Sequence, residues 1–327
     1  MKSISLGIDV SKKTLDICII DQGSESYFKI ENTVKAIKKF IRTIASLEAR
    51  ISIAMENTGL YNANLYAVLQ QHSFKVYVID SRHIKRSIGL VRGKNDKVDA
   101  KRIARFIERN HQDFDCWKPA SQSVQNIKLL MSQRRHKVKT KSALKQQIRE
   151  LKTLKATKTI TTCIHVNLKE IRQLDKHIAR LEQLINLEAA SDPNLKKDIE
   201  RLKTIPGVGN ITAWTLVIKT EGFIRLKDPR KLACFAGVVP FEQQSGTSLK
   251  TKPRVSKMAD MQLKSVLQMA AMRAVRMNND LQHFYLRKVK EGKNKMSVLN
   301  AIRNKLIHIA MALIKNKTFY QNRLVLT

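Results

Sequence analysis

Short apolar runs alternate with amphipathic segments in the N-terminal part of the chain. Two runs, ISLGIDV and TLDICII, flank the polar turn SKK within residues 4–20, and this pattern predicts a β-hairpin. A helical period over residues 34–47 follows, then the strand ISIAM, a helix after NTGLY and a fourth strand, KVYVID. Strands that alternate with helices predict an α/β domain, in which strand ends are the natural place for a site.

Between residues 121 and 187 the apolar positions recur at steps of three and four. They are Leu144, Ile148, Leu151, Leu154, Ile164, Leu168, Ile171, Leu174, Ile178, Leu181 and Ile185. This spacing predicts one or two long helices, and we favour a coiled coil that pairs protomers over a helical hairpin packed on its own domain. Residues 128–158 carry many Lys and Arg but one acid, Glu150. Such a run is typical of a solvated face, and it is also a candidate path for RNA.

The C-terminal part begins after the segment SDPN, which we interpret as a linker. The stretch IERLKTIPGVGNITAWTLVIKTEG has the form helix, glycine turn, helix, which is typical of a helix-hairpin-helix. In that motif the amides at Gly207 and Gly209 approach a DNA phosphate at a helix N-terminus, although a plain helical turn uses the same glycines. Further helices are expected at residues 260–275, 280–289 and 297–315.

A polar segment at residues 243–253 is expected to form an exposed loop. Four basic residues lie in or beside it, and we expect them to contact nucleic acid: Lys250, Lys252, Arg254 and Lys257. The chain as a whole therefore divides into an α/β domain at residues 1–118, a helical coiled-coil region at 119–190 and a mainly helical domain at 191–327.

Charge narrows the choice of partner. Among 327 residues, 62 are Lys or Arg and 27 are Asp or Glu, so the formal charge is +35. Nucleic acid is the expected partner of such an excess. We expect no membrane association, because no long apolar span, amphipathic anchor or lipidation motif is visible.

The chain has four cysteines: Cys18, Cys116, Cys163 and Cys234. They have neither the spacing of zinc ligands nor that of the disulfide framework of a secreted protein, so we expect reduced, mostly buried thiols in a cytoplasmic, nucleoid-associated protein.

Acidic residues are scarce, which makes their positions informative. Asp96 and Asp99, in KNDKVDA, are three residues apart at the start of a helix, so they share a face and repel each other unless a cation lies between them. The alternative is that they serve as an N-cap and a first-turn acid. Asp9 and Glu56 lie at or near strand ends, and a two-metal site needs such acidic oxygens from several elements. We assign no role to Asp16, which falls inside the second strand.

Several motifs together resemble one family. GIDVSKKTLDICI, AMENTG and KNDKVDAKRIA resemble the carboxylate motifs of DEDD-type insertion-sequence transposases of the "one-ten" and "eleven-eleven" groups, relatives of Piv-type invertases. TIPGVGNITAWTL, KLACFAGVVP and SGTS followed by RVSK resemble that family's C-terminal transposase domain. These motifs occur in the family's order over nearly the whole chain, which makes the match far more specific than any one of them.

The resemblance implies a RuvC-like, ribonuclease-H-type fold for the N-terminal domain. It also implies a Mg²⁺ site formed by Asp9, Glu56, Asp96 and Asp99, and a nucleophilic serine, which matches Ser245 in QQSGTS. Donor and target double-stranded DNA, a noncoding bridge RNA and a dimeric or tetrameric assembly are the implied partners. The residues alone do not single out Ser245 as a nucleophile, since serines in glycine loops mostly form turns and Ser248 is a rival in the same loop.

We therefore expect a transposase that excises and inserts a mobile element through a covalent phosphoserine. Two alternatives remain. A hydrolytic nuclease or Holliday junction resolvase would use the same carboxylates with water as nucleophile, because fold does not fix function. A noncatalytic nucleic-acid-binding protein would need none of the carboxylates.

Overall fold

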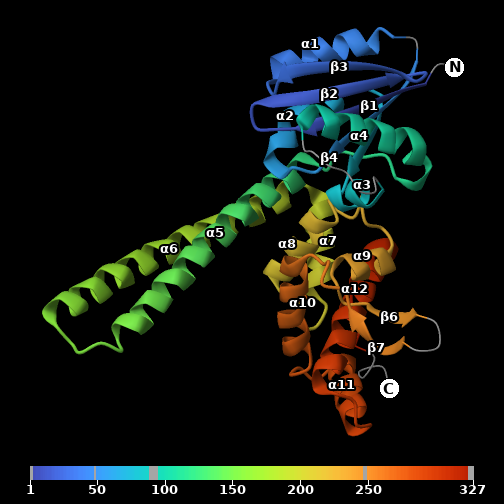
Figure 1. Cartoon of the computed structure of the whole chain (residues 1–327). Coiled ribbons are helices and arrows are strands. Elements are labelled where there is room, and N and C mark those ends of the chain that lie inside the picture. The colour runs from blue at the N-terminus through green and yellow to red at the C-terminus, as the bar shows by residue number, and fades with distance from the viewer. Residues whose placement is uncertain (1–2, 48, 88–94, 246–248, 323–327) are drawn as a thin grey trace. The chain divides into compact units, whose positions relative to one another are not determined.

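A computed structural model describes residues 3–47, 49–87, 95–245 and 249–322. The chain forms two compact units, Met1–Pro119 and Ala120–Thr327 (Figure 1).

The first unit contains a five-stranded mixed sheet in the order β3-β2-β1-β4-β5. Its strands are β1 (Ser3–Val10), β2 (Thr14–Asp21), β3 (Ser24–Glu31), β4 (Arg50–Glu56) and β5 (Lys75–Ile79). The helices are α1 (Val34–Ala45), α2 (Ala63–Leu69), α3 (Ser81–Ser87) and α4 (Asp96–Asn110), with short 3-10 turns at Gly59–Asn62 and His111–Asp113. Strands β1, β2 and β3 are antiparallel neighbours, whereas β4 and β5 run parallel to β1. This arrangement fits a ribonuclease-H-like α/β domain.

The hairpin and the two later strands confirm the sequence prediction, but β3 was not predicted. Strand β3 lies at the sheet edge, and most of its residues are exposed, so it lacks the apolar alternation by which a strand is recognised.

Helices cover both faces of the sheet. Apolar residues of β1, β2 and β4 pack with α1 and α2 on one face, and α4 covers the other. Helix α4 lies against β1 so closely that a Cβ on Gly7 would be 2.2 Å from the Ala100 carbonyl oxygen and 2.2 Å from the Ala104 nitrogen. The glycine therefore lets the start of α4 approach the end of β1, where Asp9 lies.

The second unit is mainly helical. It contains α5 (Gln122–Leu151), α6 (Lys158–Ser191), α7 (Pro193–Lys203), α8 (Asn210–Lys219), α9 (Pro229–Phe235), β6 (Pro240–Ser245), β7 (Leu249–Val255), α10 (Met261–Ala274), α11 (Asp280–Lys290) and α12 (Lys295–Asn316). The core includes fully buried Trp214 of α8 and residues of every helix from α5 to α12. The three predicted C-terminal helices are confirmed as α10, α11 and α12.

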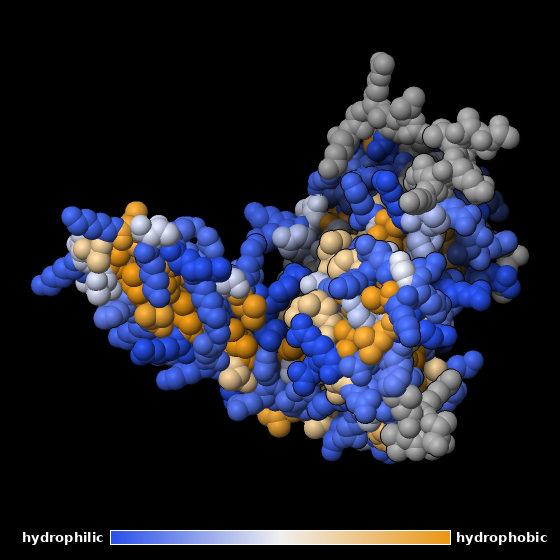
Figure 2. All heavy atoms as spheres, turned by 90° about the horizontal axis from the view of Figure 1, so that it is seen from below, coloured by the Kyte–Doolittle hydropathy of each residue, from blue (hydrophilic) through white to orange (hydrophobic). Residues whose placement is uncertain are grey.

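Helices α5 and α6 pack against each other as a hairpin. Buried Ile148, Ile171 and Leu174 lie on the predicted apolar period, and Arg134 donates to Glu182 at 2.7 Å across the pair. Figure 2 shows apolar atoms along the visible face of this hairpin. Pairing between protomers stays a prediction.

Two predictions for the second unit were wrong. The segment SDPN is no loose linker, because Asp192 caps α7 by accepting from the Asn194 and Leu195 amides, each at 3.1 Å, directly after α6 ends. The polar segment at 243–253 is largely strand, since β6 and β7 pair as an antiparallel hairpin. Its side chains are mostly polar, so the hydrophobic pattern gave no indication of the strands.

Candidate active site

Asp9 is the next-to-last residue of β1, and its side chain lies on the face that α4 covers. Strand alternation fixes this, because the neighbouring Ile8 and Val10 point into the apolar core on the opposite face. Asp9 pairs directly with Asp16 of β2 in the antiparallel register. Asp9 is thus held at an ordered strand end next to a second carboxylate.

Glu56 is the last residue of β4, the parallel neighbour of β1. Ile8 pairs with Met55, so the residues that follow them, Asp9 and Glu56, lie side by side near the ends of their strands. The turn after Glu56 is fixed by Asn62, which is fully buried and donates to the Glu56 carbonyl oxygen at 2.9 Å while accepting from the Thr58 amide at 2.9 Å. The motif NTGLYN therefore positions Glu56, a role for Asn62 that sequence reasoning missed.

Asp96 and Asp99 occupy the first turn of α4. The cap is Asn95, whose side chain accepts from the Lys97 amide at 3.0 Å, so neither aspartate is needed as the N-cap. Asp99 accepts a hydrogen bond from Arg102 at 2.7 Å. Because Ala100 of the same helix lies against Gly7 of β1, the start of α4 lies near the strand end that carries Asp9.

The acids influence one another electrostatically. The pKa of Asp9 is raised to about 6, first by burial and then by the negative charges of Asp96, Asp99, Glu56 and Asp16. Raised carboxyl pKa values are typical of functional sites, because like charges near one another resist ionisation. A bound cation would relieve this repulsion.

The donor set fits a divalent metal ion in chemistry and charge. Carboxylates are the ligands of hard divalent cations, and here they come from β1, β4 and α4. Among the described residues, however, no three His, Cys, Asp or Glu side chains are already grouped to hold an ion. A Mg²⁺ site therefore stays a proposal.

The predicted serine and basic residues belong to the second unit. Ser245 ends β6 and pairs with Leu249 of β7, but its side chain lies outside the described residues, as do those of Lys250 and Lys252. Ser248 lies outside them altogether. Arg254 and Lys257 are exposed. The structure therefore tests none of the predicted roles of these residues.

The glycine turn at residues 205–209 separates α7 from α8. Gly207 has φ +82°, and a Cβ there would be 2.2 Å from the Ala270 carbonyl oxygen, so this glycine is required for packing on α10. Gly209 is the exposed N-cap of α8 and has no such neighbour. Contact of either amide with DNA stays a prediction.

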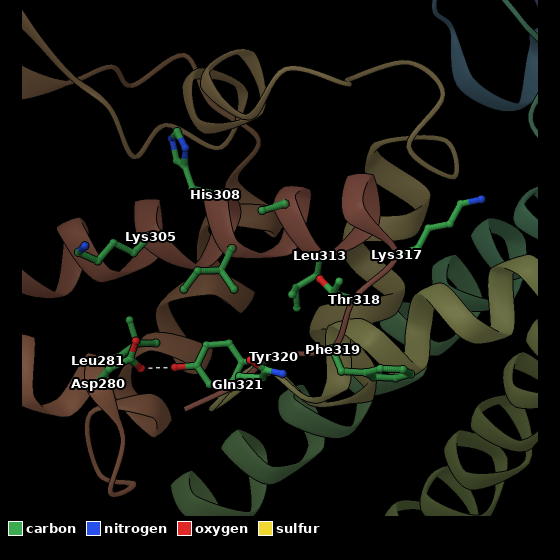
Figure 3. Close-up of a pocket in the computed structure, with 12 residues that line it drawn as sticks. Asp280, Leu281, Lys305, His308, Leu313, Lys317, Thr318, Phe319, Tyr320 and Gln321 are labelled. Atoms are coloured by element: carbon green, nitrogen blue, oxygen red, sulfur yellow. Dashed lines mark hydrogen bonds between the residues drawn. The ribbon is translucent and has the colours of Figure 1, made fainter. Parts of the chain in front are cut away.

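The second unit also has a groove that the sequence did not indicate. It has a volume of about 860 Å³ and lies between α12, the start of α11 and the segment at 318–321 (Figure 3). Tyr320 donates to Asp280 across it, and Lys305, His308 and Lys317 lie on its rim. In Figure 3 these three basic side chains point in different directions, so they form no common anion site.

The cysteines and the hydropathy of the helices bear on two other sequence expectations. All four cysteines are free, but only Cys18 is buried, so the expectation of mostly buried thiols was wrong. No helix in the described part of the chain is long and apolar enough to cross a membrane.

Comparison with known proteins gives consistent results over both units. A family model for a transposase of the DEDD, IS110 type matches residues 6–157, and one described as "Transposase IS116/IS110/IS902 family" matches residues 199–286. The pilin gene-inverting protein of Moraxella bovis is 26% identical over 331 residues, covering 99% of each chain. The transposase of insertion sequence IS1111A from Coxiella burnetii is 25% identical over 355 residues, covering 98% of this chain and 92% of the relative. The chain therefore belongs to the IS116/IS110/IS902 family of transposases and is an enzyme of DNA recombination.

Proposed function

We propose that the chain moves an insertion sequence by Mg²⁺-dependent cleavage and exchange of DNA strands through a covalent phosphoserine. The Mg²⁺ ligands in this proposal are Asp9, Glu56, Asp96 and Asp99, and the nucleophile is Ser245. The observation that carries it is the position of these acids, which lie at the ends of the neighbouring strands β1 and β4 and in the first turn of α4. The negative charges of the other three acids are among the causes that raise the pKa of Asp9.

The chemistry of the proposed step balances without ATP. The Ser245 Oγ forms a bond to a DNA phosphorus, the bond from phosphorus to a deoxyribose oxygen breaks, and the serine proton is transferred to the departing oxygen or to solvent. The hydroxyl of another strand then attacks the phosphoserine, which restores the DNA phosphodiester and frees Ser245. Each phosphodiester bond broken is replaced by a bond of similar energy.

A serine hydroxyl is a weak nucleophile at neutral pH, so the step needs help. A bound divalent cation would supply stabilisation of the charge that develops on the phosphate. The carboxylates hold that cation, and the basic residues beside the serine segment, including exposed Arg254 and Lys257, bind the DNA backbone.

Partners follow from the resemblance and the charge. We propose donor and target double-stranded DNA as substrates and a bridge RNA as the guide that selects them. The +35 charge is consistent with simultaneous binding of both polyanions. Strand exchange also needs several active sites in one synapse, so we propose a dimer or tetramer.

The test of the nucleophile is a denaturing gel of labelled donor DNA incubated with the protein, its RNA and Mg²⁺. A labelled band at protein mass is expected for wild type and for Ser248→Ala, and its loss is expected for Ser245→Ala. Cleaved DNA without a protein band, with full cleavage by Ser245→Ala, would identify water as the nucleophile and the protein as a nuclease.

A further inference from the structure

A buried aspartate next to the proposed metal site has no role in the family's tetrad. Asp16 of β2 is 1% exposed, and it is the direct cross-strand partner of Asp9. Directly paired residues point to the same face of a sheet, with Cβ atoms roughly 5 Å apart. The Asp16 carboxylate therefore lies beside the Asp9 carboxylate, under α4.

One oxygen of Asp16 is firmly held, and the other is not. The Tyr27 hydroxyl of β3 donates to Oδ1, and the Lys29 ammonium lies 3.6 Å from the same oxygen. Within the described part of the chain, Oδ2 is buried and has no hydrogen-bond partner. Buried polar atoms normally have partners, because an unpaired one keeps the full cost of leaving water. The missing partner of Oδ2 points to a ligand that the carboxylate is arranged to receive.

Tyr27 connects this carboxylate to the helix that carries the other acids. The Lys97 ammonium lies 4.9 Å from the centre of the Tyr27 ring, and Lys97 directly follows Asp96 in the first turn of α4. Burial and the bond to Asp16 raise the pKa of Tyr27, so its hydroxyl keeps the proton that it donates. Strands β2 and β3 are thus tied to the start of α4 beside the site.

We propose that Asp16 is a fifth carboxylate of the metal site, with Oδ1 fixed by Tyr27 and Oδ2 available to the divalent cation or its hydration shell. This inference rests on the proposed function, because it requires the tetrad to bind a cation. The alternative is a purely structural role, in which Asp16 only ties β2 to β3. The two roles predict different metal affinities for a variant that lacks the Asp16 carboxylate, because loss of a purely structural contact would leave the metal affinity unchanged.

The experiment measures Mn²⁺ binding by the full-length protein in the absence of DNA. Free Mn²⁺ is followed by its electron paramagnetic resonance signal, and thermal unfolding checks the fold of each variant. Asp16→Asn preserves the shape and an acceptor for Tyr27 but removes the charge, and it is expected to weaken Mn²⁺ binding about 10-fold or more. Wild-type affinity in Asp16→Asn would overturn the proposal.

The matched control is Glu25→Gln. Glu25 also joins β3 to α4, through Lys101 at 2.5 Å and Arg105 at 2.7 Å, and its loss removes the same charge. Unchanged Mn²⁺ affinity is expected for this variant. Equal weakening of Mn²⁺ binding in Asp16→Asn and Glu25→Gln would show that loss of any contact between β3 and α4 lowers the affinity. That result would also overturn the proposal.

Two further variants keep the test decisive. If Asp16→Asn does not fold, Tyr27→Phe retains the charge and releases Oδ1, and it is expected to weaken binding about 3-fold; wild-type affinity there would overturn the proposal. Asp9→Asn separates this inference from the proposed function. Loss of binding in Asp9→Asn with normal binding in Asp16→Asn refutes only the role of Asp16, whereas normal binding in Asp9→Asn refutes the metal site itself.

Discussion

The carboxylate site and the serine segment are built in opposite ways. The acids lie at the ends of β1 and β4 and in the first turn of α4, around a sheet packed with helices on both faces. Ser245 ends one strand of a two-stranded hairpin, in which Phe241 and Arg254 are exposed. Two strands alone have little stability, so packing does little to fix their geometry. The fold therefore positions the proposed metal ligands, whereas packing does little to fix the strand pair that carries the proposed nucleophile, Ser245.

The largest expected effect on DNA cleavage comes from a substitution in the carboxylate site. Asp96→Asn removes a proposed metal ligand in the exposed first turn of α4, where Asn95 still caps the helix. We expect DNA cleavage to fall by roughly 10³-fold with unfolding temperature unchanged, because such electrostatic groups contribute on that scale. Single-turnover cleavage on a sequencing gel measures it. Cleavage within threefold of wild type would show that the acidic cluster is not catalytic.

Gly7→Ala tests how strictly packing positions these acids. The added Cβ would overlap the backbone of α4 at Ala100 and Ala104, so α4 must move away from β1. We expect a loss of about 3 kcal/mol in unfolding free energy, measured by urea denaturation. Gly209→Ala is the control in the second unit, since it meets no atom within 4 Å and should cost less than about 1 kcal/mol. Equal losses of unfolding free energy in the two variants would show that the close approach of α4 to Gly7 does not stabilise the fold.

Metal binding should depend on pH through Asp9. Its pKa, raised to about 6 from 3.8, means that below about pH 6 a proton must leave before a cation can bind. We therefore expect Mn²⁺ affinity to rise roughly tenfold per pH unit up to about pH 6 and to level off above it. Mn²⁺ titrations between pH 4.5 and 7.5, at roughly half-unit steps, would show this. A flat profile would mean that Asp9 binds no ion.

The smallest expected effect concerns the serine segment. Replacing both Arg254 and Lys257 with Gln should weaken DNA binding evenly across sequences and lower the slope of log affinity against log salt by about 2, one unit for each lost phosphate contact. Filter binding at several salt concentrations measures the slope. An unchanged slope would show that these exposed side chains do not contact the DNA backbone.

The sequence predicted those helices and strands that have a periodic pattern of apolar residues. The β1–β2 hairpin, β4, β5 and the three C-terminal helices follow from periodic burial, and the acids were found because they follow buried strands or begin a helix. Edge strand β3 is mostly exposed, and strands β6 and β7 contain few apolar residues, so their patterns carry no such information.

The hairpin register could have revealed Asp16. With SKK as the turn, Asp9 and Asp16 fall opposite each other, but Asp16 within an apolar run was interpreted simply as part of the strand. The bond from Tyr27 to Asp16 and the bond from Asn62 to the Glu56 carbonyl oxygen join polar side chains across turns, and no hydrophobic periodicity predicts them.

One experiment tests directly whether the carboxylates and Ser245 act in the same step of DNA strand attack. Covalent protein–DNA product is measured on a denaturing gel for wild type with Mg²⁺, wild type with excess EDTA, and Asp9→Asn with Mg²⁺, each after DNA binding has been verified. We expect a covalent product only for wild type with Mg²⁺. A product of normal yield at Ser245 in Asp9→Asn would contradict it, because strand attack would then proceed without the carboxylate site.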